Sequence, residues 1–320
     1  MQGTFVLPMT LAKNWNWENI WLLFSLVGMV FLNLFLAYLF IADLYQVYRE
    51  IDPGQLLILA IFGLGWGLGA VLFGLGMDKL GMSLGYPIIM GLIASIGGLL
   101  PMFIQHTGDI LKPTGMFMMA GVAVSIAGII VCSKAAAGKS DKLEKTVITP
   151  VLAQGIIIAI AAGILSSLPN IGFSFGTAVT REAMALGTPE AMAGNAVWAL
   201  FFSAGFIPNL LYTAYLIRKN RSAGLFMTQH TARNFLLGVL MAVLWIASFY
   251  LYGISSSKLG NWGNIVGWPM FISVSIIVGN LWGLWRGEWK YSSRQSRQLL
   301  NLGILILMIA MVLIGLSNVV

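Results

Sequence analysis

Residues 20–41 form the stretch that decides the fold, IWLLFSLVGMVFLNLFLAYLFI, in which no side chain is charged. An α-helix of about 20 apolar residues crosses the roughly 30 Å of hydrocarbon in a bilayer. Further stretches of the same character cover residues 56–77, 82–104, 115–132, 151–178, 193–216, 235–254, 262–284 and 299–316. The sequence therefore predicts an all-α polytopic membrane protein with nine full spans.

The composition of the whole chain supports this fold class. Hydrophobic residues make up 58% of the 320 residues and charged residues only 9%, whereas soluble domains are about 25% charged. A soluble α/β enzyme is excluded, because a globule of this size could not bury so much apolar surface. The alternating short segments that are typical of a membrane β-barrel are also absent from the sequence.

The net charge of +7 comes from lysines and arginines in the short segments between spans. Of the 18 basic residues, 14 lie in residues 11–19, 78–81, 133–150, 217–234 and 285–298. Basic loops of this kind face the cytoplasm, so we expect these segments inside the cell and a multi-pass protein in a bacterial inner membrane. The scattered charge favours this interpretation over nucleic-acid binding.

Two parts of the chain share a pattern that indicates an internal duplication. Residues 79–81 (KLG) precede residues 85–87 (GYP), and residues 258–260 (KLG) precede residues 267–269 (GWP). An offset of about 180 positions is what a repeated half-transporter would produce in a chain of this length. We therefore expect two five-helix repeats of inverted topology at residues 1–132 and 151–320, joined by a cytoplasmic linker at residues 133–150.

The two expected repeats are unequal in their number of spans. The second contains five, beginning with residues 151–178, whereas the first contains four. Where the offset places the partner of residues 151–178, the chain has only the apolar stub 2–8. We expect a ten-helix parent fold whose first helix is largely missing here.

Glycine-rich and polar positions inside the spans are candidates for a solute pathway. Glycines recur at 63, 65, 67, 69, 74 and 76 around Trp66. Glycines four apart share a helix face and permit close packing; the other interpretation is a glycine-lined space in which Trp66 offers a flat face to a sugar. Pro169 precedes Asn170 and Ser174, so we expect a helix break beside polar groups, with a kink that binds nothing as the alternative.

Carboxylates are scarce, and the sequence places none in the middle of a span. Those nearest the hydrocarbon are Asp43, Asp78, Asp109, Glu182 and Glu288. A proton-coupled carrier needs a group that loads and releases a proton, and partial burial moves the pKa of a carboxyl group towards neutrality. Glu182, which follows the expected break, is our candidate. The alternative is a solvated loop acid paired with Arg181.

The sequence offers no residue pattern for metal, cofactor or enzyme chemistry. His106 and His230 are far apart and lack companions at the spacing of metal ligands. The single Cys132 excludes an intramolecular disulfide and a cysteine cluster. No paired acid and base and no activated nucleophile lies inside a span. We expect no metal, no cofactor and a protein that is not an enzyme.

Short motifs are spread along the chain in a fixed order. They are residues 14–21 (NWNWENIW), 66–75 (WGLGAVLFGL), 80–85 (LGMSLG), 182–187 (EAMALG) and 283–289 (GLWRGEW). Together they resemble the L-rhamnose–proton symporter family within the drug/metabolite transporter superfamily, and the resemblance covers almost the whole chain.

The resemblance implies ten helices in two five-helix repeats around a central cavity, in contact with membrane lipid. It also implies uptake of a small neutral sugar, L-rhamnose, together with protons. A sugar is held by hydrogen bonds to its hydroxyl groups and by an aromatic face, and the candidates on helices expected to line the cavity are Trp66, Asn170, Ser174, Trp268 and Asn280. The alternative is an exporter or facilitator of another small polar metabolite in the same superfamily.

Overall fold

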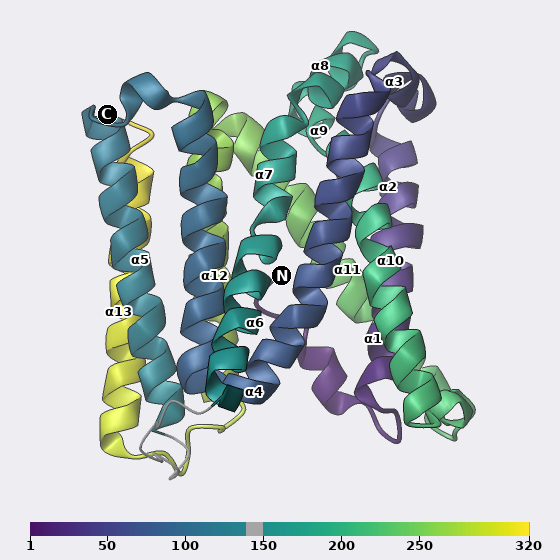
Figure 1. Ribbon diagram of the computed structural model, residues 1–320, viewed down its shortest axis with the longest axis vertical. Helices are drawn as coiled ribbons and strands as arrows, with labels where there is room; N and C mark the ends of the chain where they lie inside the picture. The colour runs from purple at the N-terminus through teal and green to yellow at the C-terminus, as the bar shows by residue number, and fades with distance from the viewer. Residues whose placement is uncertain (139–149, 320) are drawn as a thin grey trace. The chain divides into compact units, whose positions relative to one another are not determined.

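The computed structural model describes residues 1–138 and 150–319, and Figure 1 shows them as a set of long helices. Within those residues, nine helices are long and apolar enough to cross a membrane. This confirms the predicted all-α class and the predicted number of spans. Each of these helices is apolar over a stretch of about the length that crosses a bilayer, which explains why apolar run length alone located them.

The first span consists of α1 (Trp17–Ser25), a π-helical segment (Leu26–Leu32) and α2 (Asn33–Phe40), and the short α3 (Leu44–Glu50) follows. Two spans make up α4 (Pro53–Gln105), which bends at Gly81, where φ is 67°. Glycine adopts this backbone conformation without steric cost. The later helices are α5 (Pro113–Ala137), α6 (Pro150–Ser166), α7 (Leu168–Phe175), α8 (Thr177–Ala185), α9 (Glu190–Ala193), α10 (Ala196–Lys219), α11 (Thr231–Lys258), α12 (Gly263–Trp285) and α13 (Arg294–Leu316).

The span predicted at residues 151–178 is interrupted, as the sequence suggested. It divides into α6 and α7, and Pro169 lies in the first turn of α7, where a missing N–H is tolerated. The linker expected at residues 133–150 begins inside α5, which continues to Ala137. Residues 139–149 of that linker lie outside the described residues.

The chain divides into two compact units, each of which combines segments from both sequence halves. Unit 1 contains Met1–Val71 and Gly172–Lys258, and unit 2 contains Leu72–Ile171 and Leu259–Val320. A compact unit and a sequence repeat are different things, so the two five-helix repeats stay a prediction.

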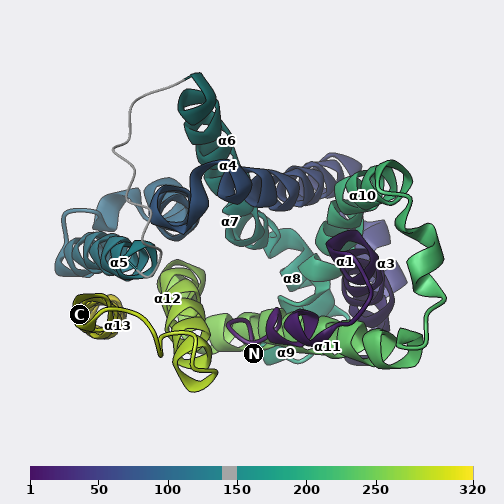
Figure 2. The same ribbon diagram turned by 90° about the horizontal axis from the view of Figure 1, so that it is seen from below.

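Unit 1 is organised around the first span. Figure 2 shows α1 between α10 and α11, and both helices contact it. Close approach of α4 to α10 is permitted by Gly63 and Gly67, where an added Cβ atom would overlap the carbonyl groups of Phe201 and Gly205. For these two glycines the structure therefore supports the packing interpretation of the ladder.

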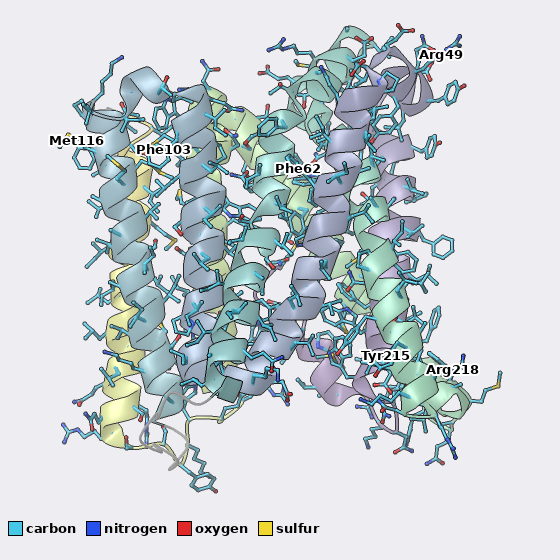
Figure 3. All side chains as sticks on the ribbon, viewed as in Figure 1. Arg49, Phe62, Phe103, Met116, Tyr215 and Arg218 are labelled. Atoms are coloured by element: carbon cyan, nitrogen blue, oxygen red, sulfur yellow. The ribbon has the colours of Figure 1, made fainter. Side chains whose placement is uncertain are left out.

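The loops of unit 1 sort to two ends as the charge pattern predicts. The segment before α1 meets the start of α11, where the backbone N–H of Lys13 donates to Oδ1 of Asn234 at 3.1 Å. At the other end the backbone N–H of Ala42 donates to Oγ1 of Thr188 at 2.8 Å. Figure 3 shows Arg49 and Arg218 at these opposite ends. The lysine- and arginine-rich loops of unit 1 thus share one end.

Unit 2 packs small residues against aliphatic ones. An extensive contact joins α5 to α13, which run side by side in Figure 1. Gly128 of α5 faces Leu307, and Gly303 of α13 faces Cys132, so that added Cβ atoms would overlap these neighbours. Small residues at such interfaces let membrane helices approach closely and gain van der Waals contact.

Candidate functional site

The interior of unit 1 is an aromatic cluster from α4, α10 and α11. Trp66 is 9% exposed and stacks on Trp245, with ring centroids 5.8 Å apart and an interplanar angle of 18°. Phe202 lies 5.2 Å from Trp66 and stacks on Trp198 at 4.9 Å. Phe173 covers the other face of Trp198 at 5.0 Å. The predicted sugar residue Trp66 therefore belongs to a continuous aromatic core.

Two polar atoms in this core have no hydrogen-bond partner among the described residues. They are Oδ1 of Asn33 and Nε1 of Trp198, and both side chains are 0% exposed. The Asn33 amide nitrogen donates to the carbonyl of Trp198 at 2.9 Å, so the two residues are neighbours. A buried polar group without a partner costs about 1–3 kcal/mol. A ligand rich in hydroxyl groups would satisfy an acceptor and a donor of this kind.

The backbone beside Asn33 is also unusual. The seven-residue π-helix Leu26–Leu32 precedes it directly, and π-helical segments are rare and frequent at functional sites. Gly28 within that segment packs against Ala242 and Trp245 of α11. The π-helix therefore brings the first span close to the aromatic cluster at the point where Asn33 enters it.

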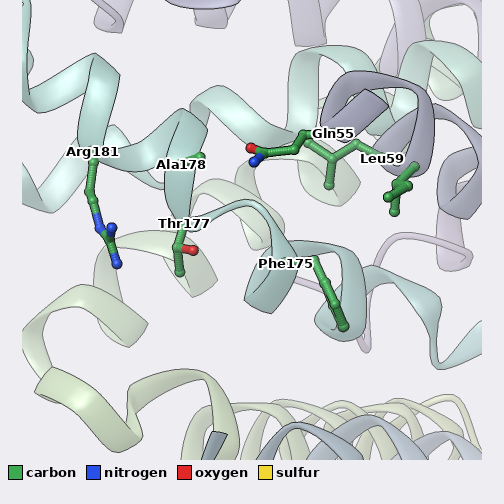
Figure 4. Close-up of a pocket in the computed structure, with 7 residues that line it drawn as sticks. Gln55, Leu59, Phe175, Thr177, Ala178 and Arg181 are labelled. Carbon is green, nitrogen blue, oxygen red and sulfur yellow. The ribbon is translucent and has the colours of Figure 1, made fainter. Parts of the chain in front are cut away.

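A pocket of about 300 Å³ opens in unit 1 beside the break after α7. It is lined by Gln55, Ile58, Leu59, Phe175, Thr177, Ala178 and Arg181. Figure 4 shows Thr177 and Arg181 projecting from the same side of α8, and the Gln55 amide reaching from α4 towards that helix. The volume is at the lower end of the range for small-molecule sites. The lining combines hydrogen-bonding groups with the face of one aromatic ring.

The sequence of α8 explains how these side chains come to face the pocket. Val179 and Ala183 are four residues apart and are buried in an apolar cluster with residues of α3 and α10. Thr177 and Arg181 are also four residues apart and occupy the opposite, exposed side, since positions i and i+4 share one helix face. Burial of one face thus presents the other to the pocket.

Tyr48 fixes the end of unit 1 near that cluster. Its hydroxyl donates to the carbonyl of Ala196 at 2.5 Å and accepts from the backbone N–H of Leu200 at 3.2 Å. Burial raises the pKa of Tyr48 well above its usual value of 10, because the phenolate would lose its hydration. Tyr48 is therefore a neutral hydrogen-bonding group that ties α3 to α10.

The predicted sugar residues do not come together as one cluster within either unit. Ser174, which is 3% exposed, lies with Trp66 in unit 1, whereas Asn170, Trp268 and Asn280 belong to unit 2. The Asn170 amide donates to the carbonyls of Gly97 at 2.7 Å and Asn264 at 2.9 Å. In the same unit, Trp268 Nε1 donates to the carbonyl of Ile93 at 3.0 Å. The Asn280 amide donates to its own helix at Ile276, at 2.9 Å.

The predicted proton-coupling residue Glu182 lies on α8 and is partly buried. It is four residues after Ala178, which lines the pocket, so it stands at the edge of the pocket-facing side. Among the described residues, no ion pair joins Glu182 to Arg181. The histidines are equally separate: His106 pairs with Asp109 at 3.3 Å, and no metal-binding group of three His, Cys, Asp or Glu residues was found in the described part of the chain.

Comparison with known proteins identifies the family. The sequence profile described as L-rhamnose-proton symport protein (RhaT) matches residues 2–320. The chain belongs to this family. Two similar proteins are the L-rhamnose-proton symporters of Yersinia pestis (strain Pestoides F) and Yersinia pseudotuberculosis serotype O:1b (strain IP 31758). Each is 27% identical to this chain over an alignment of 320 positions, which covers 98% of this chain and 93% of the relative.

Membership in the RhaT family confirms several expectations from the sequence. The family is one of transporters, so the protein is not an enzyme. Together with the nine apolar helices in the described residues, it makes the chain a multi-pass protein of the bacterial inner membrane.

One buried carboxylate of this RhaT-family chain escaped the sequence analysis. Glu18 is only 3% exposed, although it stands at the start of α1 in a stretch rich in polar and aromatic residues. Its hydrogen-bond partners include Asn220 and Ser222, about two hundred positions away along the chain. The available signal was the motif NWNWENIW itself, which contains the acid and contributed to the family resemblance.

Proposed function

We propose that this chain imports L-rhamnose together with protons across the bacterial inner membrane. The match of the symporter family to residues 2–320 carries the proposal, and the names of the relatives specify both the sugar and the coupling ion. Export or facilitated passage of another small polar metabolite is the less favoured alternative.

The proposed sugar contacts are Trp66, Asn170, Ser174, Trp268 and Asn280, as the sequence suggested. Trp66 has the strongest support, because it shares an aromatic cluster with Trp198 and its unpartnered indole N–H. A sugar presents an apolar C–H face, which packs on an aromatic ring, and hydroxyl groups, which hydrogen-bond to amides and indoles. We add Asn33 to this set for its unpartnered Oδ1.

The pocket beside α8 is the proposed place where the sugar first binds. Its hydrogen-bonding groups are the Gln55 amide, the Thr177 hydroxyl and the Arg181 guanidinium, and Phe175 supplies an aromatic face that is 47% exposed. It lies at the end of unit 1 away from the basic loops, the end that the charge pattern assigns to the outside. Glu182, at the edge of the same side of α8, is the proton-coupling candidate that the sequence suggested.

Uptake by the purified full-length chain in proteoliposomes tests the proposal. An inward proton gradient should drive labelled L-rhamnose to an internal concentration above the external one, and a protonophore should abolish that accumulation. Unlabelled L-rhamnose should compete more strongly than L-mannose, which carries an additional 6-hydroxyl group, and than its stereoisomer L-fucose. Equilibration that ignores the gradient would identify a facilitator, and no L-rhamnose movement at all would refute the assignment.

A further inference from the structure

Glu18 is the one carboxylate in the buried class among the residues that the structure describes. The other described acidic side chains are partly or fully exposed. Glu18 lies in the first turn of α1, at the end of unit 1 that carries the basic loops. A buried ionisable residue at a membrane helix is expensive to maintain, so it marks a functional position unless packing alone accounts for it.

Three hydrogen-bond donors converge on a single oxygen of Glu18. Oε1 accepts from the Ser222 hydroxyl at 2.7 Å, from the Asn220 amide at 3.0 Å and from the Asn16 amide at 3.2 Å. Asn19, the next residue, donates its amide to the carbonyl of Ser222 at 3.0 Å. The carboxylate therefore ties the first turn of α1 to residues 220–222, which follow the end of α10.

This arrangement of donors suits the ionised carboxylate. An ionised oxygen accepts several hydrogen bonds strongly, whereas a neutral carboxyl group is a weaker acceptor and carries a hydroxyl that must donate. Protonation of Glu18 would therefore weaken all three contacts together and loosen residues 220–222 from α1. Loss of the proton would restore them. Such a tie can bias a conformational equilibrium by the difference in its strength between the two protonation states.

The same helix connects Glu18 with the aromatic core. Trp21 follows Glu18 by three positions, so both lie on one side of α1. The indole of Trp21 donates to Oδ1 of Asn209 in α10 at 3.0 Å. The Asn209 amide in turn donates to the carbonyl of Gly205 at 3.0 Å. Gly205 packs against the ring of Trp66. These contacts form a continuous path from the start of α1 to the side of α10 that borders the proposed sugar contacts.

We propose that Glu18 is a proton-coupling residue in addition to Glu182: it binds and releases a proton at the opposite end of unit 1, and its protonation state controls the tie between α1 and residues 220–222. The inference rests on the proposed function of proton-coupled sugar import. The step is a proton transfer: one O–H bond of a hydronium ion breaks as one forms on the carboxylate when one side is accessible, and the reverse transfer returns the proton to water on the other side.

Basic side chains surround this position without neutralising it. On the elements packed against the start of α1, the charged and titratable groups at that end are Lys13, Tyr212, Tyr215, Arg218, Lys219, Arg221, His230 and Arg233. None of them forms an ion pair with Glu18 among the described residues, and all but the half-buried Tyr212 and His230 are exposed. The direct partners of the carboxylate are thus neutral donors, which allows it to gain a proton without leaving a buried cation unpaired.

The decisive variant is Glu18→Gln, which keeps the size of the side chain and one acceptor oxygen but cannot exchange a proton. Glu190→Gln is the matched control, because Glu190 is an exposed acid at the opposite end of unit 1. Both are compared with the unaltered chain in proteoliposomes, by gradient-driven accumulation and by counterflow, the exchange of labelled for unlabelled L-rhamnose at equal pH on both sides.

We expect Glu18→Gln to lose accumulation, so that the internal sugar only equals the external sugar, while counterflow persists. Glu190→Gln should retain both. Accumulation by Glu18→Gln at the level of the control would overturn the proposal. So would loss of counterflow in a variant that L-rhamnose still stabilises against heat, because Glu18 would then serve movement in general and not coupling. Accumulation of L-rhamnose by the unaltered chain tests the proposed function separately from the role of Glu18.

A second variant keeps the proposal testable if Glu18→Gln does not fold. Ser222→Ala removes the donor of the shortest hydrogen bond to Glu18 and leaves the carboxylate in place. The ionised form loses stabilisation, so the pH dependence of counterflow should move upward by roughly one pH unit. An unchanged pH profile in Ser222→Ala would show that the hydroxyl contact does not act on a titrating group, and would overturn the inference.

Discussion

The two compact units use their buried polar side chains in different ways. In unit 2, Trp268 Nε1 donates to the carbonyl of Ile93, and the Asn170 amide donates to two further carbonyls. In unit 1, the buried Trp198 Nε1 and Asn33 Oδ1 have no partner among the described residues. In unit 2 these polar side chains hydrogen-bond to backbone carbonyls of other helices. In unit 1 one donor and one acceptor have no partner among the described residues, and a bound sugar could pair with them. The difference separates buried polar groups that are already paired with the protein backbone from buried polar groups that have no partner among the described residues.

The largest effect is expected where unit 1 brings two backbones together. Gly67→Val would place side-chain atoms against the carbonyl of Gly205, and a helix backbone cannot move aside as a flexible side chain can. We expect destabilisation of about 3 kcal/mol or more, seen as loss of the monodisperse peak in detergent size-exclusion chromatography.

Gly74→Ala is the control for that steric argument. Gly74 lies in the same helix, but outside its own stretch of that helix no atom of the described residues stands within 4 Å of an added Cβ. Alanine has the higher helix propensity by about 1 kcal/mol, so this variant should be at least as stable as the unaltered chain. If both substitutions destabilise the protein equally, glycine is needed for the conformation of α4 itself and not for its close approach to α10.

Both the fold and part of the site follow from the sequence, for different physical reasons. The nine spans and the break before Asn170 were predicted, because apolar length and proline chemistry act locally along the chain. The burial of Glu18 was not predicted, since Asn220 and Ser222, which help to enclose it, are remote in sequence. Likewise, Trp198 and Trp268 look alike in the sequence, and only their neighbours show that the Trp268 indole N–H is paired and that the Trp198 indole N–H has no partner in the described part of the chain.

A medium effect is expected at Asn170 in unit 2. Asn170→Ala removes two hydrogen bonds to backbone carbonyls and leaves a small cavity at a side chain that is 0% exposed. Hydrogen bonds between membrane helices contribute about 0.6 kcal/mol each on average, so with the cavity we expect a loss of about 2 kcal/mol. Thermal unfolding in detergent measures it.

Asn280→Ala provides the comparison, because the Asn280 amide donates only within its own helix among the bonds described, to Ile276. It should lower the unfolding temperature less than Asn170→Ala does. If both variants unfold at the same temperature, the Asn170 contacts with Gly97 and Asn264 do not stabilise unit 2, and the contrast between the units weakens.

The smallest difference, and the sharpest test of the comparison, comes from one substitution made in both units. Trp198→Phe and Trp268→Phe remove the same volume from side chains that are 0% and 2% exposed, so their cavity costs should be similar. Trp268→Phe also loses a formed hydrogen bond to Ile93, whereas Trp198→Phe removes an N–H that has no partner among the described residues. Unfolding should therefore be easier for Trp268→Phe by about 1 kcal/mol.

Sugar affinity should separate the same two variants in the opposite sense. A sugar hydroxyl that accepts from Trp198 Nε1 contributes a hydrogen bond that phenylalanine cannot make, so Trp198→Phe should raise the KM of L-rhamnose uptake about tenfold. Trp268→Phe would then lose more stability, because its indole N–H is paired with a backbone carbonyl and stabilises the fold. Trp198→Phe would lose more affinity, because its indole N–H has no partner among the described residues and is available to the proposed ligand. A larger stability loss at Trp198 than at Trp268, with unchanged KM, would mean that its N–H is satisfied within the folded protein, and the sugar contacts would then have to be sought among the residues that line the pocket beside α8.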